Sequence, residues 1–510
     1  MNVTTDYNVD VLVCGGGVAG VSAAIAAARQ GARVLLLEKR ESLGGICTNG
    51  YITGIAGHVD GICREWVERL AAQGDAVLKP HLPAVEPEKA KVMFEHMLIQ
   101  SGVRFIYGAH VAEAGVEDGR IEDVAVYTLN GMMDIRAKFV IDCTGDATVA
   151  SAAGAPCEVG GAEFMGLNES SSLGFRLGYV DMKQYKEAEK LYFEKTRDQD
   201  PEKRPLFLQY LQMKAIEDGF LPEMLSPGNL IYPIVGSFDE SCMDVCLDAT
   251  HSYYCHNTSP EDLTRQIVDQ HNKVILFTEF LRKYVPGFGN CKLEHMGDQI
   301  GTREGRRVVG EYVLTSEDIC SARKFDDGVV IFPEVLDSHH PTCNTETAMR
   351  HIHLDHEPEN AICRPSQDDD NLKMHPFAPM GGYEVRQNPR CFCEIPLRSL
   401  IARDVDNLFV AGRCLSADWH AVGAVRVVAT SMTMGQAAGN AAALCLKEGI
   451  PFARDVDGRA VREMQKEQGV PLDKPLEGYW ARNRDMKGKV IIGGDMAMIM
   501  GEDGTMSFQA

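Results

Sequence analysis

Three glycines near the start of the chain have the spacing of a phosphate-binding turn. They are Gly15, Gly17 and Gly20, in the pattern G-x-G-x-x-G. In such a turn the first glycine permits a tight bend, the second lets a pyrophosphate approach the backbone, and the third lets a helix pack closely against a strand. The chemistry that this spacing predicts is the binding of a dinucleotide through its phosphates.

The elements that must position these glycines can be predicted from the residues around them. Residues 10–14 predict a short buried strand, residues 18–30 an Ala-rich helix that ends at Gly31, and residues 33–38 a second buried strand. Glu38, at the end of the second strand, would accept hydrogen bonds from a ribose diol and would repel a 2′-phosphate. The sequence therefore predicts a βαβ unit that prefers FAD or NAD to NADP.

Two later segments distinguish FAD from NAD. Leu43-Gly44-Gly45 follows the second strand, as in flavoproteins in which this loop runs beneath the isoalloxazine ring. Residues 139–146 predict a strand that ends in Thr-Gly-Asp, a turn that resembles the adenosine side of FAD domains of the glutathione-reductase type. Both features favour FAD.

A second group of small residues lies far along the chain. Residues 407–413 predict a buried strand that ends at Gly412, and residues 427–446 predict a helix rich in Gly and Ala. Small side chains let such a helix lie close to a sheet and a cofactor, and its N-terminus carries about half a positive charge. Directed at N1 and the C2 carbonyl of a flavin, that charge would favour the anionic reduced form.

These features together resemble the FAD-dependent oxidoreductase family of glutathione-reductase-type flavoproteins, which has relatives in the fumarate reductases, succinate dehydrogenases and heterodisulfide-reductase flavin subunits. Further blocks that carry the resemblance lie at 259–264, 280–287, 301–318 and 393–400. The resemblance implies an α/β fold, with a Rossmann-like FAD-binding domain of the glutathione-reductase type and an inserted α+β substrate domain. The expected FAD-binding residues are Gly15, Gly17, Ala19, Gly20, Glu38, Lys39, Gly44, Gly45, Thr48, Thr144, Gly145, Asp146, Gly412 and Arg413.

The domain organisation that the resemblance implies interrupts the FAD-binding domain with an insertion. The expected parts are residues 1–155 (FAD-binding domain, first part), 156–398 (substrate domain insertion), 399–450 (FAD-binding domain, return segment) and 451–510 (C-terminal extension). Within the insertion, residues 229–235 and 328–332 predict strands, and residues 260–284 predict a long helix with apolar side chains at helical spacing.

Cys47 lies where the disulfide reductases have the first cysteine of their redox-active segment. The second cysteine would stand five residues further on, and that position is Ile52. We therefore interpret Cys47 as a packing residue against the flavin in preference to a redox nucleophile. The sequence also shows no second nucleotide-binding unit for NADPH and no C-x-x-C run typical of an iron–sulfur protein.

Flavin chemistry requires a titratable group near the ring, because a proton moves separately from the hydride. His420 is the preferred candidate, in the predicted loop before the small-residue helix and close to Asp418, which would fix its tautomer. The alternative interpretation is a histidine of a surface loop. Arg303 and Arg426 would bind a substrate carboxylate or carbonyl, and for Arg426 pairing with a structural acid is an equal alternative.

Other charged and metal-binding residue types receive structural interpretations. Arg306, Arg307 and Glu311 are interpreted as structural ion pairs. A cluster of histidines could hold a metal, but its segment is polar and acidic, which is typical of a solvated or substrate-covering loop, so no metal is predicted. The clustered histidines are His339, His340, His351, His353 and His356.

Composition excludes several classes of partner. The 510 residues include 51 Lys and Arg against 73 Asp and Glu, a net charge of −22, which has the wrong sign for a nucleic-acid-binding protein. Sixteen cysteines in a chain of this length predict reduced thiols. The apolar run at 11–28 has no basic residue before Arg29, so it predicts neither a signal peptide nor a membrane span. We expect a cytoplasmic protein, a homo-oligomer that binds no nucleic acid.

These observations predict an FAD-dependent oxidoreductase that transfers a hydride between a small organic substrate and flavin N5. The favoured reaction is dehydrogenation of a C–OH, C–N or activated C–H group. One alternative is a reductase of an activated C=C bond, fed by an external electron donor. The other is an electron-transfer flavoprotein subunit of a larger complex.

Overall fold

The main sheet combines strands from both ends of the chain. The computed structural model describes residues 4–78, 83–199, 205–222, 230–237, 239–320, 323–332, 338–339, 341–342, 347–348, 392–474, 490–493, 496–500 and 506–508. In spatial order the main sheet contains β5 (Arg104–Ile106), β2 (Val34–Leu37), β1 (Thr4–Cys14), β8 (Gly131–Asp142), β7 (Arg120–Thr128) and β6 (His110–Glu117), and β21 (Leu408–Val410) also pairs with β8. β5, β2, β1, β8 and β21 pair in parallel, and β6 and β7 extend the sheet in antiparallel fashion. The fold is therefore mixed α/β with a parallel centre.

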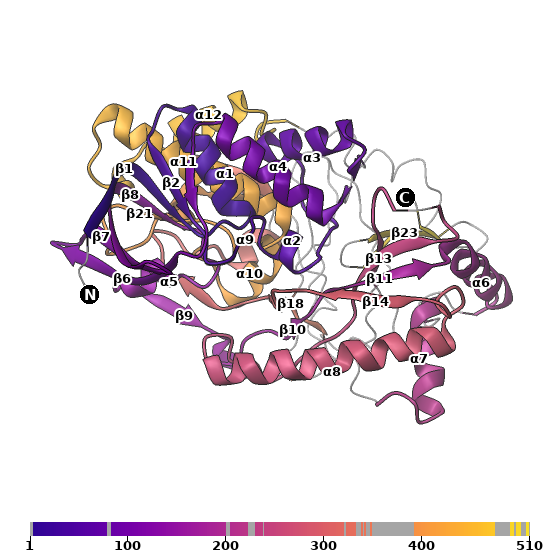
Figure 1. The fold of residues 1–510 in the computed structure, drawn as a ribbon. Helices are drawn as coiled ribbons and strands as arrows, with labels where there is room; N and C mark the ends of the chain where they lie inside the picture. The colour runs from indigo at the N-terminus through magenta and orange to yellow at the C-terminus, as the bar shows by residue number, and fades with distance from the viewer. Residues whose placement is uncertain are drawn as a thin grey trace.

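Two helices rich in small residues cover this sheet together. They are α1 (Val18–Arg29) and α11 (Val428–Glu448), which pack against each other (Figure 1). A Cβ added at Gly435 would lie 2.0 Å from the carbonyl oxygen of Ala19, and one at Gly439 would lie 2.3 Å from that of Ala23. Only glycine allows the two backbones to come this close. The predicted small-residue helix is confirmed.

A second sheet lies beside the first, on the right in Figure 1. Its strands, in spatial order, are β12 (Leu230–Pro233), β13 (Met243–Asp248), β11 (Phe175–Val180) and β14 (Lys292–Met296). The helices of this part are α6 (Met182–Lys195), α7 (Phe207–Glu217) and α8 (Pro260–Tyr284). Phe175, Phe277 and Phe280 are fully buried in its core, which is separate from the core around α1 and α11.

Short elements complete the described chain. Helical segments are α2 (Ile46–Asn49), α3 (Gly61–Ala72), α4 (Pro87–Gln100), α5 (Thr148–Ala152), η1 (Ala162–Phe164), α9 (Ser316–Cys320), η2 (Leu397–Leu400), α10 (Trp419–Val425), η3 (Ala453–Asp455) and α12 (Gly458–Glu467). Five small sheets have two strands each: β3 (Ala76–Val77) with β4 (Ala84–Val85), β9 (Cys157–Val159) with β16 (Arg306–Val308), β10 (Ser171–Ser172) with β15 (Gly301–Thr302), β17 (Gly328–Phe332) with β20 (Cys393–Pro396), and β18 (Ser338–His339) with β19 (Thr347–Ala348). A further sheet has three strands, in the order β22 (Val490–Gly493), β23 (Met496–Met500) and β24 (Met506–Phe508). Among the described helices, none combines the length and the apolar character that crossing a bilayer requires.

The predicted elements match the structure closely. The long helix and the strand at 328–332 have the predicted bounds, as α8 and β17. β1 begins six residues earlier than predicted, at Thr4, because β8 is long enough to pair with it as far as Met133. His420 lies in the first turn of α10 and not in a loop, because Asp418 begins a short helix before α11.

Glu189 predicts a pH dependence of stability. It is buried on α6, where burial raises its pKa from 4.5 to about 8, against the opposing effect of the Tyr185 hydroxyl at 3.4 Å. Because the pKa of Glu189 is higher in the folded state, protonation of this carboxyl stabilises the fold. That contribution is fully present below about pH 4.5 and is lost as the pH rises through about 8. Glu189→Gln should therefore be more stable than wild type at about pH 8.5, by on the order of 3 kcal/mol, with little difference at about pH 5. Urea unfolding at both pH values measures this, and an equal difference at the two would contradict it.

Candidate active site

The three glycines of the phosphate turn have different surroundings. Gly15 has a φ of +102°, and a Cβ there would lie 2.4 Å from the carbonyl oxygen of Cys143. A Cβ at Gly20 would lie 1.8 Å from the carbonyl oxygen of Gly15, whereas one at Gly17 would meet no atom within 4 Å. Gly17 is also the N-cap of α1, and no side chain caps it. The turn thus leaves open space in front of the amide groups of a helix N-terminus, which suits a phosphate group.

Glu38 closes one side of this turn. Its buried carboxylate accepts hydrogen bonds from the backbone N–H of Gly16, at 2.6 Å, and of Arg40, at 2.8 Å. Each oxygen therefore holds one amide, and each carboxylate oxygen can accept a second donor. The arrangement fixes Glu38 where a ribose diol would bind in a βαβ unit. Lys39, the next residue, is exposed.

The loop after Glu38 folds back onto the phosphate turn. The N–H of Gly44 donates to the carbonyl oxygen of Gly16 at 2.9 Å, and a Cβ at Gly45 would lie 3.2 Å from the Cα of Gly17. The hydroxyl of Thr48 donates to the carbonyl oxygen of Leu43 at 2.5 Å, so this side chain holds the loop itself. The loop is therefore packed directly against the turn.

The Thr-Gly-Asp turn after β8 is held by an acid that sequence reasoning missed. Asp142 accepts hydrogen bonds from the N–H and hydroxyl of Thr144, at 2.9 and 2.7 Å, and from the N–H of Ala150 at 2.9 Å. Burial raises its pKa. A signal was present, since a carboxylate at the end of an otherwise apolar strand needs nearby donors. Gly145 has a φ of +81°, and Asp146 pairs with Arg413 at 2.8 Å.

The return segment meets the phosphate turn, as the proposed cofactor site requires. Gly412 has a φ of +84°, and a Cβ there would lie 3.2 Å from the Cβ of Ala19. Arg413 pairs with Asp146, so the end of β21 is joined to the end of β8. The predicted FAD-binding residues of both halves thus converge at one edge of the main sheet. Their individual contacts with FAD stay predictions.

Cys47 is fully buried, with a pKa that burial raises to about 12. A thiol with so high a pKa is a poor nucleophile at neutral pH. We expect Cys47→Ala to change the rate of flavin reduction by less than about twofold, and native Cys47 to resist iodoacetamide until the chain is unfolded. Peptide mapping after labelling measures this, with half-buried Cys242 as the internal reference. Rapid native labelling of Cys47 would instead support a reactive thiol.

A second polar site lies where the two sheets meet. We call it the junction cluster, and its residues are Glu169, Asp248, His251, Arg303, His339 and Arg426. Arg426 pairs with the fully buried Glu169, Nη1 to Oε2 at 2.9 Å, and the N–H of His339 donates to the same oxygen at 3.0 Å. Of the two interpretations of Arg426, the structure shows the pairing with an acid.

Arg303 forms the other end of the cluster. It donates to the carbonyl oxygen of Ser170 at 3.0 Å and to Nε2 of His251 at 3.0 Å, and it lies 3.5 Å from Oδ2 of Asp248. Because a guanidinium can only donate, Nε2 of His251 must accept, which places the proton of the neutral ring on Nδ1. The rings of His251 and His339 have centroids 5.7 Å apart, so the two ends of the cluster are continuous.

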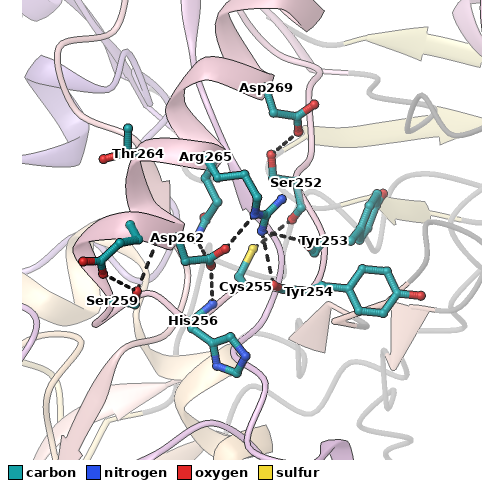
Figure 2. A network of polar contacts seen from close by, with 12 residues as sticks. Ser252, Tyr253, Tyr254, Cys255, His256, Ser259, Asp262, Thr264, Arg265 and Asp269 are labelled. Atoms are coloured by element: carbon teal, nitrogen blue, oxygen red, sulfur yellow. Dashed lines mark hydrogen bonds and ion pairs between the residues drawn. The ribbon is translucent and has the colours of Figure 1, made fainter.

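The segment that carries His251 is held in place by side chains of α8. Lys273 Nζ donates to the carbonyl oxygen of His251 at 2.5 Å. Figure 2 shows the rest of this bracing: Arg265 reaches the carbonyl oxygens of Tyr253 and Tyr254, each at 3.2 Å, and Ser252 bonds to Asp269. Five of the six residues from His251 to His256 are thus tied to one helix, since the N–H of His256 also donates to Asp262 (Figure 2).

The junction cluster adjoins the predicted flavin loop on two sides. A Cβ at Gly301, two residues before Arg303, would lie 3.4 Å from Cδ1 of Ile46, the residue after Gly45. On the other side, a Cβ at Gly57 would lie 3.1 Å from Cγ2 of Val427, the residue after Arg426. The structure therefore brings the chain segments that carry both predicted arginines next to the 44–57 segment.

His420 lies near the cluster, but its predicted partner is occupied. α10, which carries it, packs against β18, which carries His339, and Figure 1 shows both between the two sheets. The carboxylate of Asp418 accepts the N–H of Ala421 and of Ser316, each at 2.7 Å. Asp418 caps α10, because a helix N-terminus presents unpaired amides, and its predicted role in fixing the tautomer of His420 stays a prediction.

The remaining predictions about charged residues and clustered histidines have different outcomes. Arg307 forms a buried ion pair with Glu304, as predicted. Arg306 donates to the carbonyl oxygen of Asp146 at 3.1 Å and forms no ion pair with an acid among the described residues. Glu311 is exposed. In the part of the chain that the structure describes, no group of three or more His, Cys, Asp or Glu side chains is arranged to hold a metal. His340, His351, His353 and His356 lie outside the described residues.

Comparison with known families agrees with this geometry. The family model described as "FAD dependent oxidoreductase" matches residues 10–467. The chain therefore belongs to the family of FAD-dependent oxidoreductases, and it is an enzyme whose cofactor is FAD. The open space at Gly17, the uncapped N-terminus of α1 and the acceptors of Glu38 fit this cofactor.

The individual proteins to which this chain is similar have names that describe different reactions. Thiamine thiazole synthase of Methanococcus aeolicus is 30% identical over 159 residues, which is 28% of this chain and 58% of that protein. A geranylgeranyl bacteriochlorophyll reductase-like protein of Thermoplasma acidophilum has 14% identity and a TM-score of 0.40, covering 95% of this chain and 88% of its own. The flavin-dependent brominase Bmp2 has 12% identity and a TM-score of 0.38, covering 90% and 83%. The chain thus spans less than two thirds of the curated relative's length.

Proposed function

We propose that this enzyme is a dehydrogenase that removes a hydride from a carbon bearing a hydroxyl or amino group in a small organic substrate. FAD, when bound, supplies the two-electron acceptor. An external electron acceptor then completes the cycle. For the fold, we infer the glutathione-reductase type of FAD domain, which is supported by the return of β21 beside β8 and by the Thr-Gly-Asp turn at its end.

The observation that carries the proposal is the pattern of used and unused polar atoms in the junction cluster. Both arginines are paired with internal acids, Arg303 with Asp248 and Arg426 with Glu169. The second oxygen of each acid, Oδ1 of Asp248 and Oε1 of Glu169, is buried and has no hydrogen-bond partner among the described residues. Both of these atoms are acceptors. They therefore suit a substrate that brings hydrogen-bond donors, as alcohols and amines do.

The reverse reaction, reduction of a C=C bond beside a carboxylate, would require the opposite pattern. A carboxylate substrate is bound best by a cation whose charge is not already paired, whereas Arg303 and Arg426 are paired with Asp248 and Glu169. In the proposed reaction these arginines position the two acids. His420, on α10 beside the cluster, remains a candidate for moving the proton.

Anaerobic stopped-flow measurements with a metabolite panel test the proposal. The panel contains alcohols, polyols, amines and amino acids on one side and enoates on the other. We expect bleaching of the oxidised FAD absorbance by at least one alcohol or amine, and no reoxidation of the chemically reduced enzyme by enoates. Fast reoxidation by an enoate, with no reduction by any donor-bearing compound, would establish the reductase instead.

His420 provides a second measurement on the same reaction. If the imidazole of His420, and not another group of the cluster, takes the substrate proton, His420→Ala should leave FAD bound and slow its reduction by substrate about 10²-fold or more. His110 lies on β6 in the antiparallel part of the main sheet and is exposed, so His110→Ala is the matched control and should react as wild type does. Unchanged kinetics in His420→Ala would remove this side chain from the mechanism.

A further inference from the structure

Glu169 is held by one of its two carboxylate oxygens. Oε2 accepts from Nη1 of Arg426, at 2.9 Å, and from the N–H of His339, at 3.0 Å. Oε1 is buried and accepts from no donor among the described residues, although the residue itself is fully buried. A buried carboxylate oxygen without a donor costs about 1–3 kcal/mol or more, so its retention calls for an explanation.

Relaxation of the backbone does not remove this cost, because the neighbouring residues are fixed. The side chain of Asn168 donates to Glu304 at 2.5 Å and accepts from the N–H of Asn257 at 2.8 Å. On the other side, the carbonyl oxygen of Ser170 accepts from Arg303 at 3.0 Å. Glu169 thus lies between two residues that are tied to other elements. The segment is rigid enough to hold an unsatisfied oxygen at a defined place.

Charged groups from several elements lie around Glu169. Arg426 lies at the end of α10, Arg303 follows β15, and His251 lies between β13 and α8. His339 comes from β18, and the buried Glu304 is close enough for Glu169 to raise its pKa. The surroundings therefore contain three guanidinium groups, those of Arg303, Arg307 and Arg426, and two imidazoles, together with two other acids, Glu304 and Asp248. Glu169 is the one whose free oxygen lies next to the arginine that precedes α11.

We propose that Glu169 Oε1 is the proton acceptor of the reaction, with Arg426 and His339 as positioning residues. This proposal rests on the proposed function. In the step, the O–H or N–H bond of the substrate breaks and its proton forms a carboxylic acid at Oε1. The electron pair of that bond forms the C=O or C=N bond, and the hydrogen on carbon leaves with its electron pair to FAD, which is the oxidant. The proton later passes to solvent.

The variant that tests this step is Glu169→Gln, which keeps the shape. Because Arg426 and His339 both donate, the amide oxygen must face them, and the amide nitrogen then replaces Oε1 with a donor that cannot take a proton. We expect normal FAD content, normal reduction by dithionite, and a fall of about 10²- to 10⁴-fold in reduction by the best alcohol or amine of the panel. Glu311→Gln, an exposed acid outside the cluster, is the control and should react as wild type does.

A binding measurement separates this role from general damage to the site. A tertiary-alcohol analogue of the best substrate, in which a methyl group replaces the hydrogen on carbon, can donate its hydroxyl but cannot be oxidised. Its dissociation constant, read from the shift in thermal midpoint, should rise about tenfold in Glu169→Gln, the loss of about one hydrogen bond. An analogue without the hydroxyl should bind wild type and variant equally.

The outcomes distinguish this proposal from the proposed function. If no alcohol or amine reduces wild-type enzyme, the proposed function is wrong and Glu169 loses its role with it. If wild type is reduced and Glu169→Gln is reduced at a rate within about threefold, the dehydrogenase stands and Glu169 is not the proton acceptor. Should Glu169→Gln fail to fold, Glu169→Asp withdraws the carboxylate by one methylene. It should keep FAD and lose about tenfold or more in rate, and an unchanged rate would overturn the proposal.

Discussion

Replacing Gly20 by valine is expected to give a chain that neither forms the native main sheet nor binds FAD. A Cβ at this position would lie 1.8 Å from the carbonyl oxygen of Gly15 and 3.2 Å from the Cβ of Cys143. The first contact is with backbone, so no side chain can move to relieve it. The turn, the first strand and α1 would have to separate, at a cost of about 5 kcal/mol or more. Circular dichroism and the yellow absorbance of the purified protein measure the loss.

Gly17→Ala is the matched variant, because it alters the same turn without a clash. Gly17 has a φ of −66°, which alanine adopts readily, and a Cβ there meets no protein atom within 4 Å. We expect this variant to fold with a near-normal thermal midpoint of the FAD-free protein, and to bind FAD at least about tenfold more weakly, because the new methyl group occupies the space of the pyrophosphate. Wild-type affinity in Gly17→Ala would show that the phosphates bind elsewhere.

The contrast between these glycines explains why the FAD-binding half could be predicted from sequence. The constraint is local: within six residues, a left-handed turn, a close helix contact and an open approach each demand glycine. The same holds for the glycines of α11, whose contact with α1 requires small residues at every turn. A pattern of this kind can be read without knowing which distant segment packs against it.

The junction cluster could be predicted only in part. Arg303 and Arg426 were identified because arginine beside a flavin loop suggests an anion site, but their partners Asp248 and Glu169 are distant in sequence and have no pattern of their own. His251 could not be predicted from sequence for the same reason, because its contact with Arg303 depends on how α8 holds the segment around it. These long-range pairs change the conclusion about what the junction cluster offers a substrate. The sequence predicted hydrogen-bond donors from the arginines, whereas the structure leaves acceptor oxygens of the two acids without a partner among the described residues. The sequence alone therefore assigned a substrate carboxylate or carbonyl to Arg303 and Arg426, two residues that the structure pairs with acids.

The buried pair of Glu304 and Arg307 gives the second large expected effect. The carboxylate of Glu304 accepts from the N–H of Gly160 at 2.9 Å, from the side chain of Asn168 at 2.5 Å, and from Arg307. Glu304→Ala leaves these donors and a buried guanidinium without their acceptor. We expect it to lower the free energy of unfolding by about 4 kcal/mol, measured by urea denaturation. Glu311, an exposed acid in the same segment, is the control. Glu311→Ala should change the free energy of unfolding by less than about 0.5 kcal/mol.

A double variant shows whether the charge pairing itself is responsible for this loss. In Glu304→Leu/Arg307→Met neither charge remains, so the uncompensated guanidinium that makes the single change costly is gone. Arg307 also donates to the carbonyl oxygens of Ala417, at 3.1 Å, and Gly160, at 3.2 Å, so some loss should persist. We expect the double variant to lose at least about 1 kcal/mol less than the sum of the two single changes. If the two losses simply add, the pair is not coupled. In that case Glu304 stabilises the fold through Asn168 and Gly160 alone.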